Sequence, residues 1–113
     1  MVTTRPVYTS SQKKYNNLEV KMKKILITEE IWREGDMYIA YCPELDVPAC
    51  GSEIEIAKKN LREVIAIQME ETSKKGTLQE FLDAAGYKQE NEDLIPEKQF
   101  ISCTQEMIAI GAI

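Results

Sequence analysis

Few residues of this chain could carry out chemistry. The first candidates are two acidic residues that lie close together in one loop. Glu44 and Asp46 flank Leu45 in a loop that begins at Pro43. Clustered carboxylates are the ligands that hard cations such as Mg²⁺ prefer. One short loop supplies only this pair, and the chain contains no glycine-rich phosphate loop. We therefore expect no metal site and no cofactor.

Acid–base and nucleophilic catalysis are also poorly supported. The chain has no histidine, so the usual serine and cysteine dyads are missing. Its three cysteines, Cys42, Cys50 and Cys103, are an odd number without a C-x-x-C pair, which argues against a zinc site or a disulfide framework. A reactive thiolate needs an electropositive setting, but the residues near Cys42 and Cys50 are acidic. We interpret the cysteines as small buried hydrophobic residues, and we expect a cytoplasmic protein that is not an enzyme.

The charge of the chain bounds the class of partner. From residue 25 to residue 113 there are eight Lys and Arg against eighteen Asp and Glu, a net charge of −10. Such a domain repels phosphates, so we expect no nucleic acid binding and instead a basic partner, although solubility alone also explains an acidic surface. No apolar run approaches the ~18 residues of a membrane span, so no membrane contact is expected.

The elements that position these residues begin with two strands. Residues 23–31 place isoleucines on one face, which predicts a strand with one mostly buried side. Residues 37–42 are apolar on both faces, which is typical of a central strand. Gly35 permits a turn with positive φ, so the two strands are predicted to form a hairpin. Pro43 ends the second strand, and Ala49-Cys50 leaves room for a short third strand.

A long amphipathic helix is predicted after Gly51, which permits a sharp turn into it. Ser52 and Glu55 have the spacing of a capping box, and Gly76 is a natural stop, so the helix is expected over residues 52–75. One stripe of the helix is predicted to face the sheet; it consists of Ile54, Ala57, Leu61, Val64, Ile65 and Gln68, with Thr72 following.

The ends of the chain are predicted to differ in order. Residues 1–21 are polar and have no strand or helix period, which predicts a flexible basic tail outside a single domain over residues 22–113. Thr77 and Glu80 repeat the capping box, so a short helix is expected over residues 77–85. A polar, acidic loop over residues 87–97 and terminal strands at residues 99–103 and 107–110 complete the prediction.

Residues 38–65 carry a pattern that resembles a known family. A strand ends in A-Y-x-P-E-L at residues 40–45, and Gly51 precedes a helix with A-x-x-N-x-x-E at residues 57–63. With the first hairpin, this ordered set is similar to the HicB-like antitoxins, the antitoxin halves of HicA–HicB modules. The resemblance implies a partial RNase H-like βββαβ fold that lacks RNase H chemistry, with a further strand beside the first. The 37 residues after Gly76 do not have the pattern of a DNA-binding segment, so operator binding is not expected.

Together, the elements and the resemblance predict an α+β fold. We expect a mainly antiparallel sheet of three to four strands with one long helix packed on one face. A short second helix and a C-terminal strand complete the predicted architecture.

The resemblance also implies a function. We expect an antitoxin-like module that binds a small basic HicA-like ribonuclease toxin and occludes it. Tyr41 and Leu45 would supply apolar contact, and Glu44 and Asp46 would pair with basic residues of the toxin. The alternative for this loop is that it only closes the core while its acids face water. Two other functions stay open: a stand-alone oligomeric domain that binds another protein or a small ligand, and an enzyme.

A separate feature concerns self-association. The terminal apolar run consists of Met107, Ile108, Ala109 and Ile110. Such a run is difficult to leave exposed in a monomer, and the edges of the predicted sheet also need to be covered. We therefore expect a homodimer or a higher homo-oligomer with this run at the interface.

Overall fold

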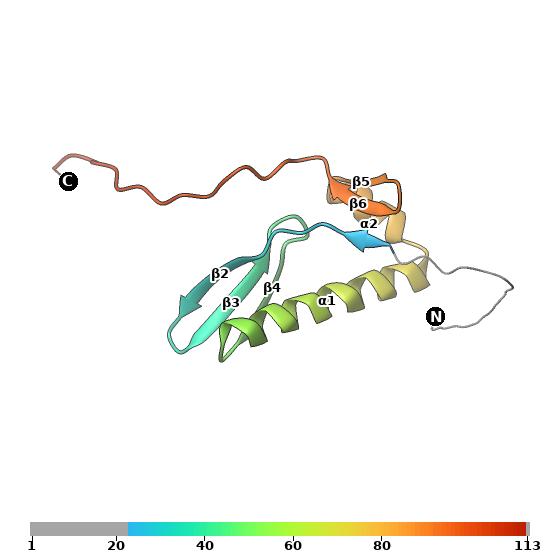
Figure 1. The fold of residues 1–113 in the computed structure, drawn as a ribbon, viewed down its shortest axis with the longest axis horizontal. Helices are drawn as coiled ribbons and strands as arrows, with labels where there is room; N and C mark the ends of the chain where they lie inside the picture. Colours follow the sequence, from blue (N-terminus) through green and yellow to red (C-terminus); the bar gives the residue numbers. More distant parts are fainter. Residues whose placement is uncertain (1–22, 113) are drawn as a thin grey trace, which may run out of the picture.

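The computed structural model describes residues 23–112, and the tail predicted over residues 1–21 lies outside them. The elements are β1 (Lys24–Ile25), β2 (Glu30–Glu34), β3 (Met37–Cys42), β4 (Val47–Gly51), α1 (Ile54–Lys75), α2 (Leu78–Ala84), β5 (Tyr87–Glu90) and β6 (Asp93–Pro96). They form two three-stranded sheets, β2-β3-β4 and β1-β6-β5, which lie near opposite ends of α1 (Figure 1). The fold class is α+β, as predicted. None of the described helices is long and apolar enough to cross a membrane.

The strand predicted over residues 23–31 is divided between the two sheets. Its start pairs with β6 as β1, and its end pairs with β3 as β2. In the link between them, side chains satisfy part of the backbone: the Thr28 N–H donates to the Glu44 carboxylate, and the Leu26 carbonyl accepts from the Tyr87 hydroxyl. Ile25, Ile27 and Ile31 share one face, and Glu29 is the one interruption, which was too weak a signal to reveal the division.

Substitution of Tyr87 by phenylalanine tests how much the link depends on this contact. Tyr87 is buried and donates to the Leu26 carbonyl at 2.6 Å. Phenylalanine keeps the ring but leaves that carbonyl without its donor, so the free energy of unfolding should fall by about 1 kcal/mol in urea titrations. The control is Tyr41→Phe, which removes a hydrogen bond to Asp46 at the surface. An equal loss in both variants would contradict a special role for the buried hydroxyl.

The β2-β3-β4 sheet is antiparallel and contains the predicted hairpin. Gly35 in its turn has a positive φ of 61°. The third strand is longer than the predicted Ala49-Cys50, because β4 includes Val47, Pro48 and Gly51. Proline is tolerated here because β4 pairs with β3 alone in this sheet, and an edge strand need not donate on its outer side.

The ends of α1 agree with the prediction at one side and not at the other. At the C-terminus, Gly76 has φ 75°, and the N–H groups of Gly76 and Thr77 donate to the carbonyls of Ser73 and Thr72, which is a Schellman motif. At the N-terminus, the helix starts at Ile54, and its N-cap residue makes no side-chain capping bond. The predicted capping box is therefore wrong.

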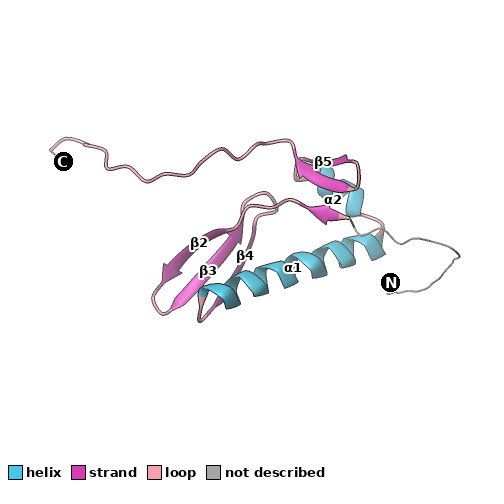
Figure 2. Cartoon of the chain, in the orientation of Figure 1, coloured by secondary structure: helices cyan, strands magenta, loops and turns pink. Residues whose placement is uncertain are grey.

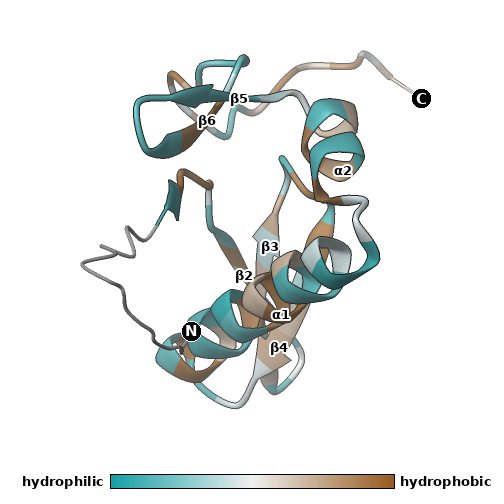
Figure 3. Ribbon diagram, turned by 90° about the vertical axis from the view of Figure 1, so that its right-hand side faces the viewer, coloured by the Kyte–Doolittle hydropathy of each residue, from teal (hydrophilic) through white to brown (hydrophobic). Residues whose placement is uncertain are grey.

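The core lies between α1 and one face of the β2-β3-β4 sheet. Figure 3 shows α1 lying across β3 and β4. The buried residues of the core are Ala40, Cys42, Leu45, Val47, Ala57, Leu61, Ile65, Leu82 and Tyr87. The predicted helix stripe was too wide, since Ile54 and Val64 are 44% and 41% exposed. A narrow stripe is sufficient because the sheet packs against one side of the helix.

The C-terminal part differs most from the prediction. The short helix α2 forms inside the expected range, but Thr77 makes no side-chain capping bond there. Residues 87–97 are not a loop, since β5 and β6 form a hairpin that turns at Asn91 with φ 58°. Asparagine adopts positive φ more readily than most residues, and the buried Tyr87 anchors the hairpin to the core.

Beyond Glu97 the chain continues as an extended segment without strand pairing (Figure 2). We call residues 98–112 the arm. All of its residues are exposed, and the strands predicted at residues 99–103 and 107–110 do not form. In Figure 1 the arm runs away from the body, beyond the β2–β3 hairpin. The predicted C-terminal strand is thus replaced by an arm that makes no strand pairing within the described chain.

Candidate functional site

One face of the β2-β3-β4 sheet is turned away from α1. Residues directly opposite each other in antiparallel strands point to the same side of a sheet. The register therefore defines an open face, which consists of Glu30, Trp32, Glu34, Met37, Ile39, Tyr41, Pro48 and Cys50. The alternate residues of β3, Ala40 and Cys42, are fully buried under α1. The open face is thus the side of the sheet that remains available to a partner.

Large apolar side chains occupy the middle of the open face. Trp32 and Met37 are each 39% exposed, and Ile39 lies opposite Trp32. The rings of Trp32 and Tyr41 meet edge to face with their centroids 6.1 Å apart. This arrangement is favourable for aromatic pairs and holds both rings in place. Tryptophan, tyrosine and methionine are enriched in protein interfaces, so the composition fits a docking surface.

Carboxylates border these side chains. Trp32 Nε1 donates to Glu34 at 2.6 Å, and the Tyr41 hydroxyl donates to Asp46 at 2.6 Å. The hydrogen bond to Asp46 raises the pKa of Tyr41, so its hydroxyl stays protonated at neutral pH. Glu30 adds a third carboxylate beside Tyr41. The eight residues of the open face include no lysine or arginine, so the surface suits a basic partner. One basic residue at its border is Lys98 of the arm, which lines a pocket together with Glu30.

The predicted contact residues divide into two pairs. Tyr41 lies on the open face, and Asp46 lies beside it with an exposed side chain and φ 56°. Glu44 points inward, where its two oxygens accept from the N–H and hydroxyl of Thr28 at 2.9 and 2.6 Å. Leu45 is 7% exposed and belongs to the core. For Glu44 and Leu45 the structure therefore favours the alternative that the loop closes the core.

Several residues of the open face were missed from the sequence. Trp32 was given no role in the prediction, and the apolar residues Met37 and Ile39 were attributed to a central strand that is apolar on both faces. The apolar character of both faces of residues 37–42 was the available signal. It could not show that one helix covers a single face, because the position of a second layer is not encoded in a strand's own pattern.

The open face is held rigidly from behind. Asn60 of α1 donates from Nδ2 to the Cys50 carbonyl at 2.8 Å, which ties β4 to the helix. Glu44 ties the loop after β3 to the link before β2 in the same way. A surface whose backbone is fixed in this way loses little conformational entropy when it binds.

The cysteines and acids give little support to chemistry at this site. Burial raises the pKa of Cys42 to about 11, so its thiol is a poor nucleophile. Cys50 and Cys103 are exposed and free, so the interpretation of all three as buried residues was correct for Cys42 alone. Between residues 23 and 112, no group of three or more potential ligands could hold a metal ion.

Comparison of the chain with known proteins identified no relative. No family model matches the chain, and no curated protein or solved structure matches it.

Proposed function

We propose that this protein is a HicB-like antitoxin module that binds a small basic HicA-type ribonuclease and covers it. The observation that carries the proposal is the open face: an aromatic and apolar centre bordered by carboxylates, with no basic residue among its members. A ribonuclease has a basic RNA-binding surface, and the open face is complementary to such a surface in charge. Occlusion of that surface would block access of RNA without any catalysis by this chain.

The fold supports the same proposal. The three antiparallel strands β2, β3 and β4 are followed by the long helix α1, and β6 lies parallel to β1. This order supports a partial RNase H-like βββαβ domain, in which a further strand lies beside the first, with the difference that β1 and β6 lie in a sheet separate from β2, β3 and β4. We therefore include the partial RNase H-like fold in the proposal.

Binding would proceed through charge steering and then desolvation. A net charge of −10 over residues 25–113 attracts a basic partner and accelerates encounter, and salt weakens this effect. Once docked, Trp32 and Tyr41 lose their contact with water and supply most of the binding free energy, as aromatic residues at interface centres commonly do. The exposed thiols of Cys50 and Cys103 fit a reducing compartment, so we place this activity in the cytoplasm.

The test is binding to the small basic protein encoded by the adjacent gene. We expect the purified pair to associate and the partner's ribonuclease activity to fall as this chain is added. Trp32→Ala should weaken the complex by about 30-fold or more, the effect of losing a hot-spot residue. Full inhibition with unaltered affinity of Trp32→Ala would remove the open face from the interface.

The charge component has its own matched control. Glu34→Lys combined with Asp46→Lys should slow association several-fold at low salt and much less at high salt. Glu63→Lys combined with Glu71→Lys makes the same charge change at exposed positions of α1 and should slow association less. Equal effects of both pairs would indicate steering by total charge alone.

The second candidate is a stand-alone oligomeric domain that binds another protein or a small ligand. The observation that favours it is the arm, whose exposed apolar side chains offer a contact between copies of this chain that requires no toxin. Failure of the chain to bind any neighbouring gene product would favour this function.

A further inference from the structure

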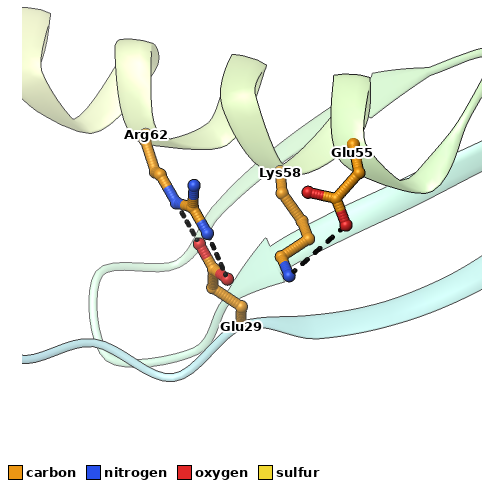
Figure 4. A network of polar contacts seen from close by, with 4 residues as sticks. All are labelled: Glu29, Glu55, Lys58 and Arg62. Carbon is orange, nitrogen blue, oxygen red and sulfur yellow. Dashed lines mark hydrogen bonds and ion pairs between the residues drawn. The ribbon is translucent and has the colours of Figure 1, made fainter.

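An apolar groove lies between α1 and the link from β1 to β2. Its apolar lining consists of Ile25, Leu26, Ile27, Ile65, Ala66 and Met69, and its volume is about 490 Å³. Two charged residues complete the lining: Arg62 Nε lies 2.9 Å from Glu29 Oε2 (Figure 4). Leu26 is 56% exposed, so the groove is open to water in the described part of the chain. An open groove of this size and character can hold several apolar side chains.

The arm presents a segment of matching character. The side chain of Met107 is fully exposed, and those of Ile108 and Ile110 are 77% and 69% exposed. Glu106 precedes them and is the only charged residue between residues 99 and 112. The segment therefore offers consecutive apolar side chains after a single negative charge. The groove offers an apolar lining beside one arginine.

The groove of the same chain is an unsuitable site for this segment. The first arm residues, Lys98 to Phe100, lie near Glu30, Glu44 and the link, and the arm then runs away from α1 (Figure 1). Residues 99–110 contain neither glycine nor proline, so no favoured turn residue of these types would return the chain to its own helix. The ten residues from Glu97 to Met107 extend about 33 Å, which is enough to reach a second molecule.

We propose that residues 107–110 of each copy fill the groove of a second copy, and that Glu106 pairs with Arg62 of that copy. Exchange of identical arms about a twofold axis forms the same contact twice and closes the assembly as a dimer. Arg62 uses Nε and Nη2 to bind Glu29, and a guanidinium carries five N–H groups. It therefore retains donors for a second carboxylate.

The arm's low charge also explains how two acidic bodies can associate. Each body carries a large negative charge, which opposes contact between their surfaces. A nearly neutral arm lets the contact form at a distance from most of that charge. The groove includes α1, which lies on the opposite side of the sheet from the open face, so the groove itself does not overlap the proposed toxin contact.

Sedimentation of the full chain at micromolar concentration tests the exchange. The full chain should sediment as a dimer, and truncation after Gln105 should give a monomer with a nearly unchanged melting temperature. Ala66→Arg places a charge in the groove and should raise the dimer dissociation constant at least tenfold. Ile67→Arg is the matched control, because Ile67 is an exposed neighbour that does not line the groove, and it should leave the constant within about twofold.

Charge reversal separates this groove from other places where the arm could bind. Glu106→Lys should weaken the dimer by bringing two cations together, and Glu106→Lys with Arg62→Glu should restore it. A monomeric full chain, or a truncated chain that is still a dimer, would overturn the proposal. Loss of the dimer on truncation, with no effect of Ala66→Arg and no rescue by the double reversal, would overturn the groove as the acceptor and favour the free edge of β2.

Discussion

Replacing Gly51 by alanine should lower the free energy of unfolding by about 1–3 kcal/mol, with a fall in melting temperature of about 5–15 °C. Gly51 ends β4 directly below the first turn of α1. A Cβ atom at this position would lie 2.7 Å from the Ala57 nitrogen and 2.7 Å from Ile56 Cγ2. The Ile56 side chain can rotate, but the Ala57 nitrogen belongs to the helix backbone, so relief requires α1 to move off β4. Thermal unfolding followed by circular dichroism measures the loss.

A neighbouring substitution serves as the control for Gly51. Ser52 is exposed, and α1 is capped at Glu53 without a side-chain hydrogen bond. Ser52→Ala should therefore change the free energy of unfolding by less than about 0.5 kcal/mol. A loss of about 1 kcal/mol would show that the capping box predicted from the sequence exists in solution. A neutral Gly51→Ala would show that the strand and helix are less closely packed than the structure indicates.

Gly51 also illustrates what the sequence could and could not predict about the fold. A glycine before a helix indicated a sharp turn, but Gly51 does not have the positive φ of Gly35 and Gly76. Its importance is the close approach of β4 to α1, which depends on tertiary packing rather than on local conformation. The hairpin and the end of α1 were predictable because turn glycines and hydrophobic periods are local signals.

The hairpin of β5 and β6 shows the opposite case. Residues 88–93 are polar, and the apolar run Leu94-Ile95-Pro96 is short and includes a proline, so composition predicted a loop. Tyr87 alone is buried there, and one residue does not make a period. Pairing of β6 with β1 across 69 residues of sequence is a long-range contact, which no local pattern encodes.

The candidate site was predictable only in part, as the fold was. The resemblance directed attention to the loop after β3, and two of its four predicted contacts, Tyr41 and Asp46, are at the surface. Trp32 enters the site through its register with Ile39 on the neighbouring strand. Register depends on the length of the turn and on which face is buried, and only the assembled sheet shows both.

Glu44→Gln should lower the free energy of unfolding at pH 7 by about 2–3 kcal/mol, because one ionised side chain connects the loop after β3 to the link before β2. Its carboxylate accepts from the Thr28 N–H at 2.9 Å and from the Thr28 hydroxyl at 2.6 Å, and Cys42 Sγ lies 3.5 Å away. Glutamine has one oxygen in place of two, so it can accept from only one of the two Thr28 donors. The Thr28 hydroxyl must then turn to accept from the NH₂ group, and the charge that strengthened both hydrogen bonds is lost. Glu63→Gln, at an exposed position of α1, is the control and should be nearly neutral.

The same carboxylate predicts how the protein responds to acid. Burial alone raises the pKa of Glu44, but the hydrogen bonds from the Thr28 side chain and backbone outweigh it, so the pKa is lowered on folding. A lowered pKa contributes stability that is fully present above the unfolded value of about 4.3 and is lost as pH falls through the folded value. The wild-type chain should therefore lose stability as pH falls below about 4.3, and Glu44→Gln should lose less over the same interval. Urea titrations at several pH values measure both slopes. Parallel curves for the two proteins would show that Thr28 does not hold the ionised form of Glu44, and the loop would then be closed by Leu45 alone.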